Sequence, residues 1–261
     1  MKISVITVCF NSFEFIGQTI DSVLSQDYSD LEYVIVDGGS TDGTLDLIRN
    51  YAEQDARIKW SSEPDQGIAD AMNKGVARAG GELITHLNSD DYYLHDQVLS
   101  QVASCFQSAP GTNWLTAGFN FISENGSFIR EIRVRRYSFR RLVRGNIILH
   151  PSTFITREAF HETGGFNPSL QYCMDYDLFL RLGMRSSPFI LDEQLTCFRV
   201  HPDSRSVSQS EKAYAEEYQV RMKFLNETGR SKWLYALDYQ VKRRLNKVFY
   251  RGLLASNRRT N

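Results

Sequence analysis

The four cysteines of the sequence have no spacing typical of a disulfide framework or a metal site. Cys9, Cys105, Cys173 and Cys197 lie far apart, with no C-x-x-C pair and no histidine at zinc-ligand spacing. This spacing excludes a disulfide framework and a common zinc site, and it indicates buried thiols in a reducing compartment.

Long hydrophobic runs are missing as well. The apolar run at residues 3–10 ends at Asn11, too early for a signal peptide or a membrane span, and no later stretch is long enough to cross a bilayer. We therefore expect a cytoplasmic protein. Hydrophobic residues make up 42% and charged residues 23%, which is typical of a folded enzyme and excludes a disordered or collagen-like chain.

Acidic residues are scarce in one segment, at the end of the sequence. Residues 230–261 hold nine Lys or Arg and a single acid, Asp238, so they carry +8 while the rest of the chain carries −9. Apolar residues from Trp233 to Leu253 recur every three to four positions, which predicts a basic amphipathic helix. Such a helix would bind an anionic membrane surface, or pack on the body or a second subunit, and the pattern leaves these open.

Strands and helices alternate in the first half of the chain. Residues 3–10, 31–36, 58–62 and 82–87 are β-branched or apolar runs, and segments with helical apolar spacing separate them. This order predicts a doubly wound α/β sheet, mostly parallel, with helices on both faces. No turn has the G-x-G-x-x-G pattern, so a dinucleotide-binding fold is not expected.

The second half is expected to hold a hairpin, of residues 114–122 and 128–134, followed by further strands and helices. Residues 147–155 and 195–200 are expected strands, and residues 173–182 an amphipathic helix. We divide the chain into a main domain, 1–229, with halves at 1–110 and 111–229, and a helical tail at 230–261.

Polar residues follow the strand at 82–87. The run Asn88-Ser89-Asp90-Asp91 ends with adjacent carboxylates, and in open α/β sheets the carboxyl ends of the strands face the ligand. Two neighbouring carboxylates suit a divalent cation such as Mg²⁺. A turn that caps the next helix is the alternative.

Other strand and helix ends carry further candidates. Asp37 follows the second strand and either contacts a ligand or only begins a helix. Asp70 and Lys74, with Asn73, share one helix face, which suits a ribose and a diphosphate or a solvated surface. Asp175 lies in the first turn of its helix, where the macrodipole favours an ionised carboxylate that can accept a proton or simply complement the helix.

Two basic features have weaker signals. His201 follows the strand at 195–200 and is either a metal ligand or a structural histidine. Arginines between residues 130 and 144 make the middle of the chain basic. They either bind a phosphorylated or lipid-linked acceptor or form a solvated surface.

The ordered set of motifs resembles the inverting family 2 glycosyltransferases of the GT-A fold, over residues 2 to about 205. The motifs that carry the resemblance are Ser4-Val5-Ile6-Thr7-Val8, Asp37-Gly38-Gly39-Ser40-Thr41-Asp42-Gly43-Thr44, Asp70-Ala71-Met72-Asn73-Lys74-Gly75, Leu87-Asn88-Ser89-Asp90-Asp91, His150-Pro151-Ser152-Thr153-Phe154, Gly164-Gly165-Phe166 and Asp175-Tyr176-Asp177-Leu178.

This resemblance implies that residues 1–229 form the catalytic domain, with a nucleotide-sugar-binding half at 1–110 and an acceptor-binding half at 111–229. It also implies roles for individual residues. Asp175 matches the catalytic base. Asp90, Asp91 and His201 match positions that hold a divalent metal, Mn²⁺ or Mg²⁺. The implied donor-binding positions are Thr7, Asp37, Asp70, Lys74, Asn88, Ser89 and Asp90. Two positions depart from the family pattern: Asn88 replaces the first carboxylate of the DxD motif, and Met174 replaces the glutamate before the base.

The resemblance implies a hexosyl- or N-acetylhexosaminyltransferase that moves one sugar, with inversion, from a nucleotide sugar, expected to be a UDP-sugar, to a glycan or lipid-linked acceptor in cell-surface polysaccharide synthesis. The alternatives are a sugar nucleotidyltransferase and a non-catalytic nucleotide-sugar-binding protein. We expect no nucleic-acid partner, we leave a homo-oligomer open, and the tail would place the protein peripherally on the cytoplasmic membrane.

Overall fold

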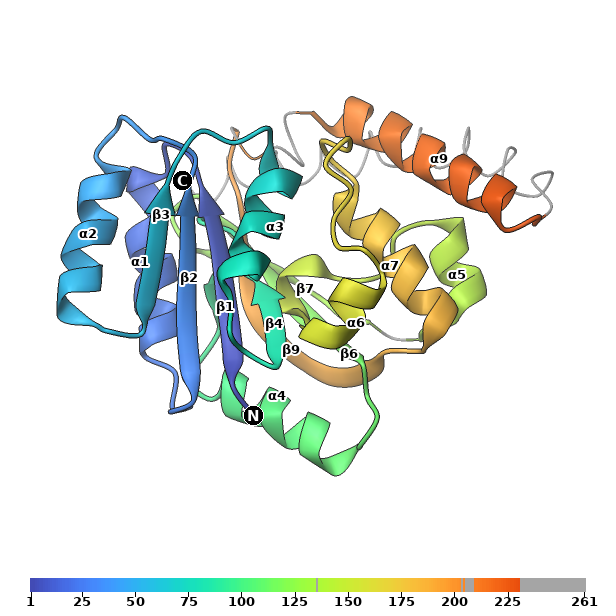
Figure 1. Cartoon of the computed structure of the whole chain (residues 1–261), viewed down its shortest axis with the longest axis horizontal. Helices are drawn as coiled ribbons and strands as arrows, with labels where there is room; N and C mark the ends of the chain where they lie inside the picture. Colours follow the sequence, from blue (N-terminus) through green and yellow to red (C-terminus); the bar gives the residue numbers. More distant parts are fainter. Residues whose placement is uncertain (135, 203, 205–208, 231–261) are drawn as a thin grey trace.

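The computed structural model describes residues 1–134, 136–202, 204 and 209–230 (Figure 1). These residues form one nine-stranded sheet in the spatial order β3-β2-β1-β4-β8-β6-β9-β5, with β7 paired to β6. The sheet runs through both expected halves of the catalytic domain. The predicted tail lies outside the described residues, apart from Arg230.

The first half of the sheet is parallel, as predicted. β1 pairs with β2 and β4, and β2 pairs with β3, each in parallel register. The bounds are β1 (Ile3–Cys9), α1 (Phe13–Leu24), β2 (Leu31–Asp37), α2 (Thr44–Gln54), β3 (Ile58–Ser62), α3 (Ile68–Arg78) and β4 (Leu83–His86).

The second half joins the first through β8, which is antiparallel to both β4 and β6. β9 then runs parallel to β6, while β5 and β7 run antiparallel to their partners. Six strands thus share one direction, which confirms a mostly parallel α/β fold. The bounds are β5 (Tyr92–Tyr93), α4 (Val98–Ser108), β6 (Trp114–Ser123), β7 (Phe128–Ile132), α5 (Phe139–Arg144), η1 (His150–Ser152), β8 (Thr153–Thr156), α6 (Arg157–Glu162), α7 (Met174–Arg185), β9 (Phe189–Val200) and α9 (Ser210–Glu227).

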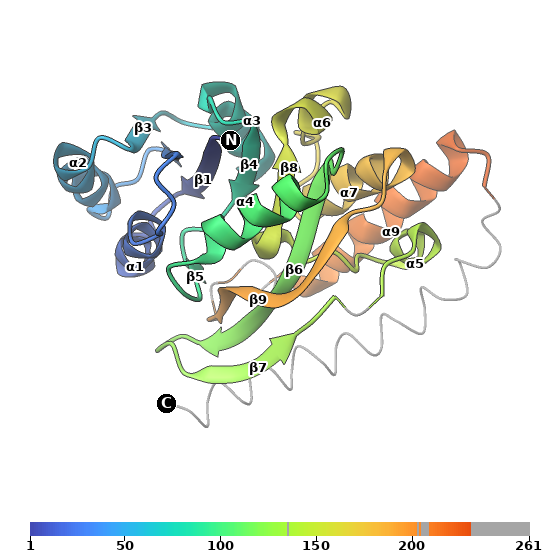
Figure 2. The same cartoon turned by 90° about the horizontal axis from the view of Figure 1, so that it is seen from below.

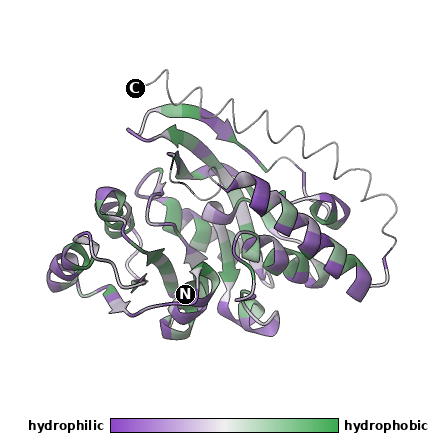
Figure 3. Cartoon of the chain, turned by 90° about the horizontal axis from the view of Figure 1, so that it is seen from above, coloured by the Kyte–Doolittle hydropathy of each residue, from purple (hydrophilic) through white to green (hydrophobic). Residues whose placement is uncertain are grey.

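Helices cover both faces of the sheet. Alternation along β1 sends Ile6 to one face, where it packs with residues of α3, α6, α7 and α9, and sends Ile3 and Val5 to the other, against α1, α2 and α4. Figure 2 shows these two helical layers on either side of β1, β4, β8 and β6. In Figure 3 the apolar colour is concentrated in the strands and the inward faces of the helices, as burial of both sheet faces requires.

Several local expectations were wrong. The strand expected at 147–155 begins only at Thr153, because residues 150–152 form a short 3₁₀ helix. The polar turn before α2 predicts Ser40 or Thr41 as its N-cap, but the N-cap is Gly43, at φ +99°, and Asp42 accepts a hydrogen bond from the amide of Thr44 at 3.0 Å. The helices α5 and α9 were not predicted. None of the helices that the structure describes is long and apolar enough to span a membrane.

A buried carboxylate ties together the strand ends opposite the site. Glu32 of β2 accepts a hydrogen bond from Ser4 at 2.5 Å and pairs with Lys2 at 3.1 Å and Lys59 at 2.7 Å. The amides of Gly80 and Gly81, before β4, also donate to it. Burial alone would raise the pKa of Glu32, but hydrogen bonds from Lys59, Ser4 and Gly80 lower it to about 2.

We predict that Glu32→Gln lowers the free energy of unfolding by roughly 1–3 kcal/mol at neutral pH, because buried donors lose a charged acceptor. Because the pKa of Glu32 is lower in the folded state than its ordinary value of 4.5, its ionised carboxylate stabilises the folded protein at pH values above 4.5. This stabilisation disappears as the pH falls toward 2. Urea unfolding between pH 7 and 3 should therefore show the two proteins converging at acid pH. Glu53→Gln, at an exposed position of α2, is the control. A constant difference across this range would contradict the assignment.

Candidate functional site

A cleft of about 1060 Å³ lies at the carboxyl ends of the parallel strands. Residues that follow β1, β2 and β4 line it, together with His201 after β9 and Asp175 at the start of α7. Parallel strands bring their carboxyl ends to one edge, which explains why residues distant in sequence meet here. The predicted positions Asn88, Ser89 and Asp90 all face this cleft.

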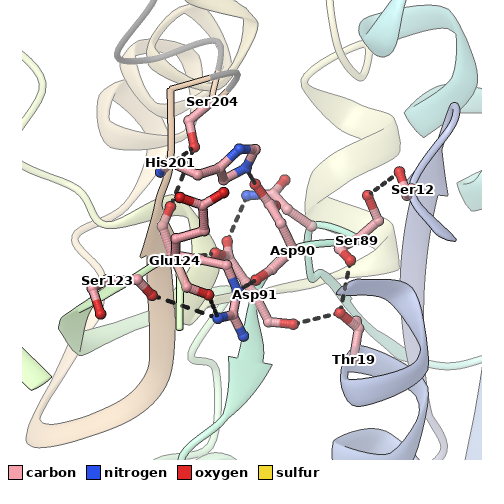
Figure 4. A network of polar contacts seen from close by, with 11 residues as sticks. Ser12, Thr19, Ser89, Asp90, Asp91, Ser123, Glu124, His201 and Ser204 are labelled. Carbon is pink, nitrogen blue, oxygen red and sulfur yellow. Dashed lines mark hydrogen bonds and ion pairs between the residues drawn. The ribbon is translucent and has the colours of Figure 1, made fainter. Parts of the chain in front are cut away.

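Asp90 and His201 meet across the wall of the cleft. The Nε2 atom of His201 lies 3.0 Å from Oδ2 of Asp90, and both side chains keep partial solvent contact (Figure 4). The imidazole also packs on the ring of Phe15, with centroids 5.1 Å apart. Beside them, Ser89 exchanges a hydrogen bond of 2.9 Å with Ser12, which joins the end of β4 to the end of β1.

Asp91 has a different environment from its neighbour. Its carboxylate is buried and accepts hydrogen bonds from the amide of Arg199 at 2.9 Å and from the side chain of Asn88 at 2.8 Å. Burial, and then the charge of Asp90, raise the pKa of Asp91 well above its ordinary value. Asp91 does not line the cleft, which departs from the expectation that it holds a metal directly.

Arg199 of β9 organises this turn, and sequence reasoning missed it. It is only 3% exposed, and its guanidinium donates to the carbonyls of Asp90 at 3.1 Å and Glu124 at 2.5 Å and to the side chain of Gln18. The charge also lies 4.8 Å from the ring centroid of Phe15. The one signal available was a charged residue within the mainly apolar run 195–200.

Asp175 lines the same cleft as Asp90 and His201. It belongs to the first turn of α7, is partly exposed, and accepts a hydrogen bond of 3.0 Å from Asn146. Burial raises the pKa of Asp175 to about 6, against the lowering effect of hydrogen bonds from Tyr176 and Asn146. A carboxylate with this pKa is ionised at neutral pH yet basic enough to accept a proton.

His150 lines the same cleft near the second half of the sheet. Burial lowers the pKa of His150 to about 4, so the imidazole is neutral at physiological pH. Its ring stacks on that of His86 with centroids 6.0 Å apart. The histidine of the His150-Pro151-Ser152 motif therefore presents an uncharged ring to the cleft.

Four predicted donor-binding residues lie outside the cleft lining. Thr7 is buried, donates to the carbonyl of Leu87 at 2.8 Å and accepts from Tyr33. Asp70 and Lys74 form an ion pair of 3.0 Å on α3. Thr7 thus connects β1 to β2 and to the residue that follows β4. Asp70 and Lys74 neutralise each other's charge outside the cleft lining.

Asp37, the fourth of these residues, is fully buried next to Gly38, which does line the cleft. Its oxygens accept from the hydroxyls of Ser40 at 2.5 Å and Ser62 at 2.6 Å and from the amide of Gly39. Burial would raise the pKa of Asp37, but the hydrogen bonds from Ser40 and Ser62 hold it below its ordinary value. The carboxylate shapes the turn that forms one wall.

The donor set of the cleft suits a hard divalent cation. Asp90 and His201 offer an oxygen and a nitrogen ligand on one wall, and the metal shell would be completed by water and phosphate oxygens. A diphosphate would meet strong repulsion in an acidic cleft unless a cation accompanied it. Within the described part of the chain, no group of three or more His, Cys, Asp or Glu residues is placed to hold a metal. The carboxylates that line the cleft are Glu14, Asp65, Asp90, Glu124, Asp175 and Glu217.

Comparison with known proteins places this cleft in a family context. The family model for glycosyl transferase family 2 matches residues 4–161, more than half of the chain. Chondroitin synthase of Pasteurella multocida is 33% identical over 181 residues, which cover 69% of this chain but only 18% of that protein. The O-antigen biosynthesis glycosyltransferase WbnJ of Escherichia coli is 29% identical over 92% of this chain and 95% of its own length.

Solved structures share the fold. A mannosyltransferase from Pyrobaculum calidifontis, in complex with GDP-Man and Mn²⁺, superposes with a TM-score of 0.70 at 18% identity over 98% of this chain and 73% of its own. Residues 1–349 of TarS from S. aureus, in complex with UDP-GlcNAc, give a TM-score of 0.68 at 20% identity over 87% and 72% of the two chains. These neighbours confirm the expected GT-A architecture of the described residues.

We predict that Arg199→Lys lowers the free energy of unfolding by about 1–3 kcal/mol, because lysine keeps the charge but not the forked donors that hold Asp90, Glu124 and Gln18. Chemical denaturation measures the change. Arg78→Lys, at a partly exposed residue paired with Glu63, should stay within about 0.5 kcal/mol. Equal, small losses in both variants would show that the guanidinium does not hold the turn.

Proposed function

This chain belongs to glycosyl transferase family 2, and we propose that it moves one sugar from a nucleotide-sugar donor to a hydroxyl of a glycan or lipid-linked acceptor, with inversion. The observation that carries the proposal is the placing of Asp175 and of the Asp90–His201 pair on the walls of one cleft. A hexosyl or N-acetylhexosaminyl group fits the same chemistry. Cell-surface polysaccharide synthesis is the expected context, given the relatives, though this chain spans less than a fifth of the first of them.

The proposed reaction is a single displacement. Asp175 takes the proton of the acceptor hydroxyl while the oxygen attacks the anomeric carbon and the bond to the diphosphate oxygen breaks. The electron pair of that bond leaves with the nucleoside diphosphate, and the proton ends on Asp175. Asn146, which donates to the carboxylate, holds it toward the cleft.

Asp90 and His201 are the residues proposed to hold the divalent cation, Mn²⁺ or Mg²⁺. When bound there, the cation would neutralise the charge that develops on the departing diphosphate. Asp91 then has a positioning role, because its carboxylate fixes the turn through Arg199 and Asn88. The donor contacts proposed for Asp37, Asp70, Lys74 and Thr7 would be indirect, through the walls that they shape.

A UDP-sugar is the proposed donor. The TarS complex contains UDP-GlcNAc, whereas the mannosyltransferase complex contains GDP-Man, so related folds use different nucleotides. The membrane contact proposed for the tail, residues 230–261, rests on sequence alone, because residues 231–261 lie outside the described part of the chain.

Release of nucleoside diphosphate from a panel of UDP-, GDP- and dTDP-sugars tests the function directly. We expect release from one donor with Mn²⁺ or Mg²⁺, and loss with EDTA and in Asp90→Asn. Asp46→Asn, at an exposed residue of α2, should leave release unchanged. Metal-independent release, or equal activity in Asp90→Asn, would contradict the proposed metal site.

Asp175→Asn should retain donor binding while turnover falls by at least about 10²-fold, since the amide cannot accept the proton. In the wild type, kcat/KM should fall as the pH drops through about 6, because protonation removes the base. Asp177→Asn, two positions along α7, serves as the control. Near-normal turnover in Asp175→Asn would remove Asp175 from this role.

A further inference from the structure

The segment that leads into α7 is held by a residue from another helix. The carboxylate of Glu216, in α9, accepts hydrogen bonds from the backbone amides of Gln171 at 3.0 Å, Tyr172 at 2.6 Å and Cys173 at 2.8 Å. These three residues immediately precede Met174, the first residue of α7, and Asp175 follows it. We propose that Glu216 is a positioning residue that fixes the segment carrying Asp175 at the cleft wall; this inference rests on the proposed function.

The contact fixes the chain where it enters the helix. Cys173, the N-cap residue of α7, makes no side-chain capping hydrogen bond, and its own amide, which has no partner within the helix, donates to Glu216 together with the two amides before it. Both oxygens of Glu216 are used: Oε1 accepts from Gln171, and Oε2 accepts from Tyr172 and Cys173. Hydrogen bonds to an ionised acceptor are stronger than neutral ones, and a carboxylate is favoured at a helix N-terminus.

The helix that carries Glu216 is itself fixed against α7. Its residues Val220, Phe224 and Leu225 are buried in the core cluster that includes α7, and the two helices lie side by side in Figures 1 and 2. The thiol of Cys173 also donates to the carbonyl of Ala213 on α9 at 3.2 Å. The packing of α9 thus fixes the position from which the Glu216 carboxylate holds the segment before α7.

The same carboxylate acts on Asp175 electrostatically. Burial is the main reason that the pKa of Asp175 is raised, and the negative charge of Glu216 raises it further. The other charged neighbours have ion-pair partners of their own: on α9, Glu217 is paired with Arg221 at 2.5 Å, and on α7, Asp177 is paired with Arg181 at 2.5 Å. His150, which lines the same cleft from η1, is neutral.

Two substitutions test the contact. Glu216→Gln removes the charge and one of the two accepting oxygens, because the amide nitrogen of glutamine only donates, so the acidic limb of kcat/KM should move to lower pH and kcat should fall severalfold. Glu216→Ala removes the charge and both oxygens, and kcat should fall roughly 10- to 100-fold, as expected for a displaced catalytic group. Donor KM should stay within about twofold in both variants, because the Asp90–His201 wall is unchanged.

The control is Glu227→Gln, at an exposed residue at the end of the same helix, which should leave kcat and the pH profile unchanged. Unchanged kcat and an unmoved acidic limb in both Glu216 variants, with Asp175→Asn inactive in the same assay, would overturn the inference alone. Full turnover in Asp175→Asn would overturn the proposed base and this inference with it. If Glu216→Ala fails to fold, kcat and the acidic limb of the kcat/KM pH profile of Glu216→Gln test the inference: an unchanged kcat and an unmoved limb would overturn it.

Discussion

The hydrogen bond between the carboxylate of Asp91 and the backbone amide of Arg199 joins the two halves of the cleft. These residues are 108 positions apart, at the ends of β4 and β9, and the bond brings His201 to within 3.0 Å of Asp90. The guanidinium of Arg199 binds the same turn through the carbonyl of Asp90. Because both the carboxylate and the guanidinium are buried, water competes little with these bonds, and the geometry of the wall depends on them.

Local patterns in the sequence predicted much of the fold. The strand runs ending near Asn11, Asp37 and Asn88 have strong periodicity and a sharp polar end, and they predicted three of the parallel strands and the edge where the cleft lies. Residues expected to meet there, Asp90, Asp175 and His201, do line one cleft. Their roles in chemistry stay predictions, because geometry places side chains without showing a reaction.

The remainder depends on contacts that no local pattern contains. Asp90 and Asp91 are adjacent and chemically identical, yet one faces the cleft and the other is buried, and only the position of β9 decides which. The helix α9 has a weak amphipathic pattern, and its importance comes from Glu216, which reaches amides more than forty residues earlier in the chain. Likewise, the late start of β8 follows from the 3₁₀ turn at His150–Ser152.

The proposed single displacement needs a base and a leaving-group site in one cleft, and Asp175 and the Asp90–His201 pair are the residues proposed for these roles. The anomeric configuration of the new glycosidic bond, measured by NMR coupling constants on the product, tests this claim most directly. We expect inversion, so that a donor with an α-linked sugar yields a β-linked product. A product with retained configuration would contradict the account, because one displacement assisted by Asp175 cannot give it.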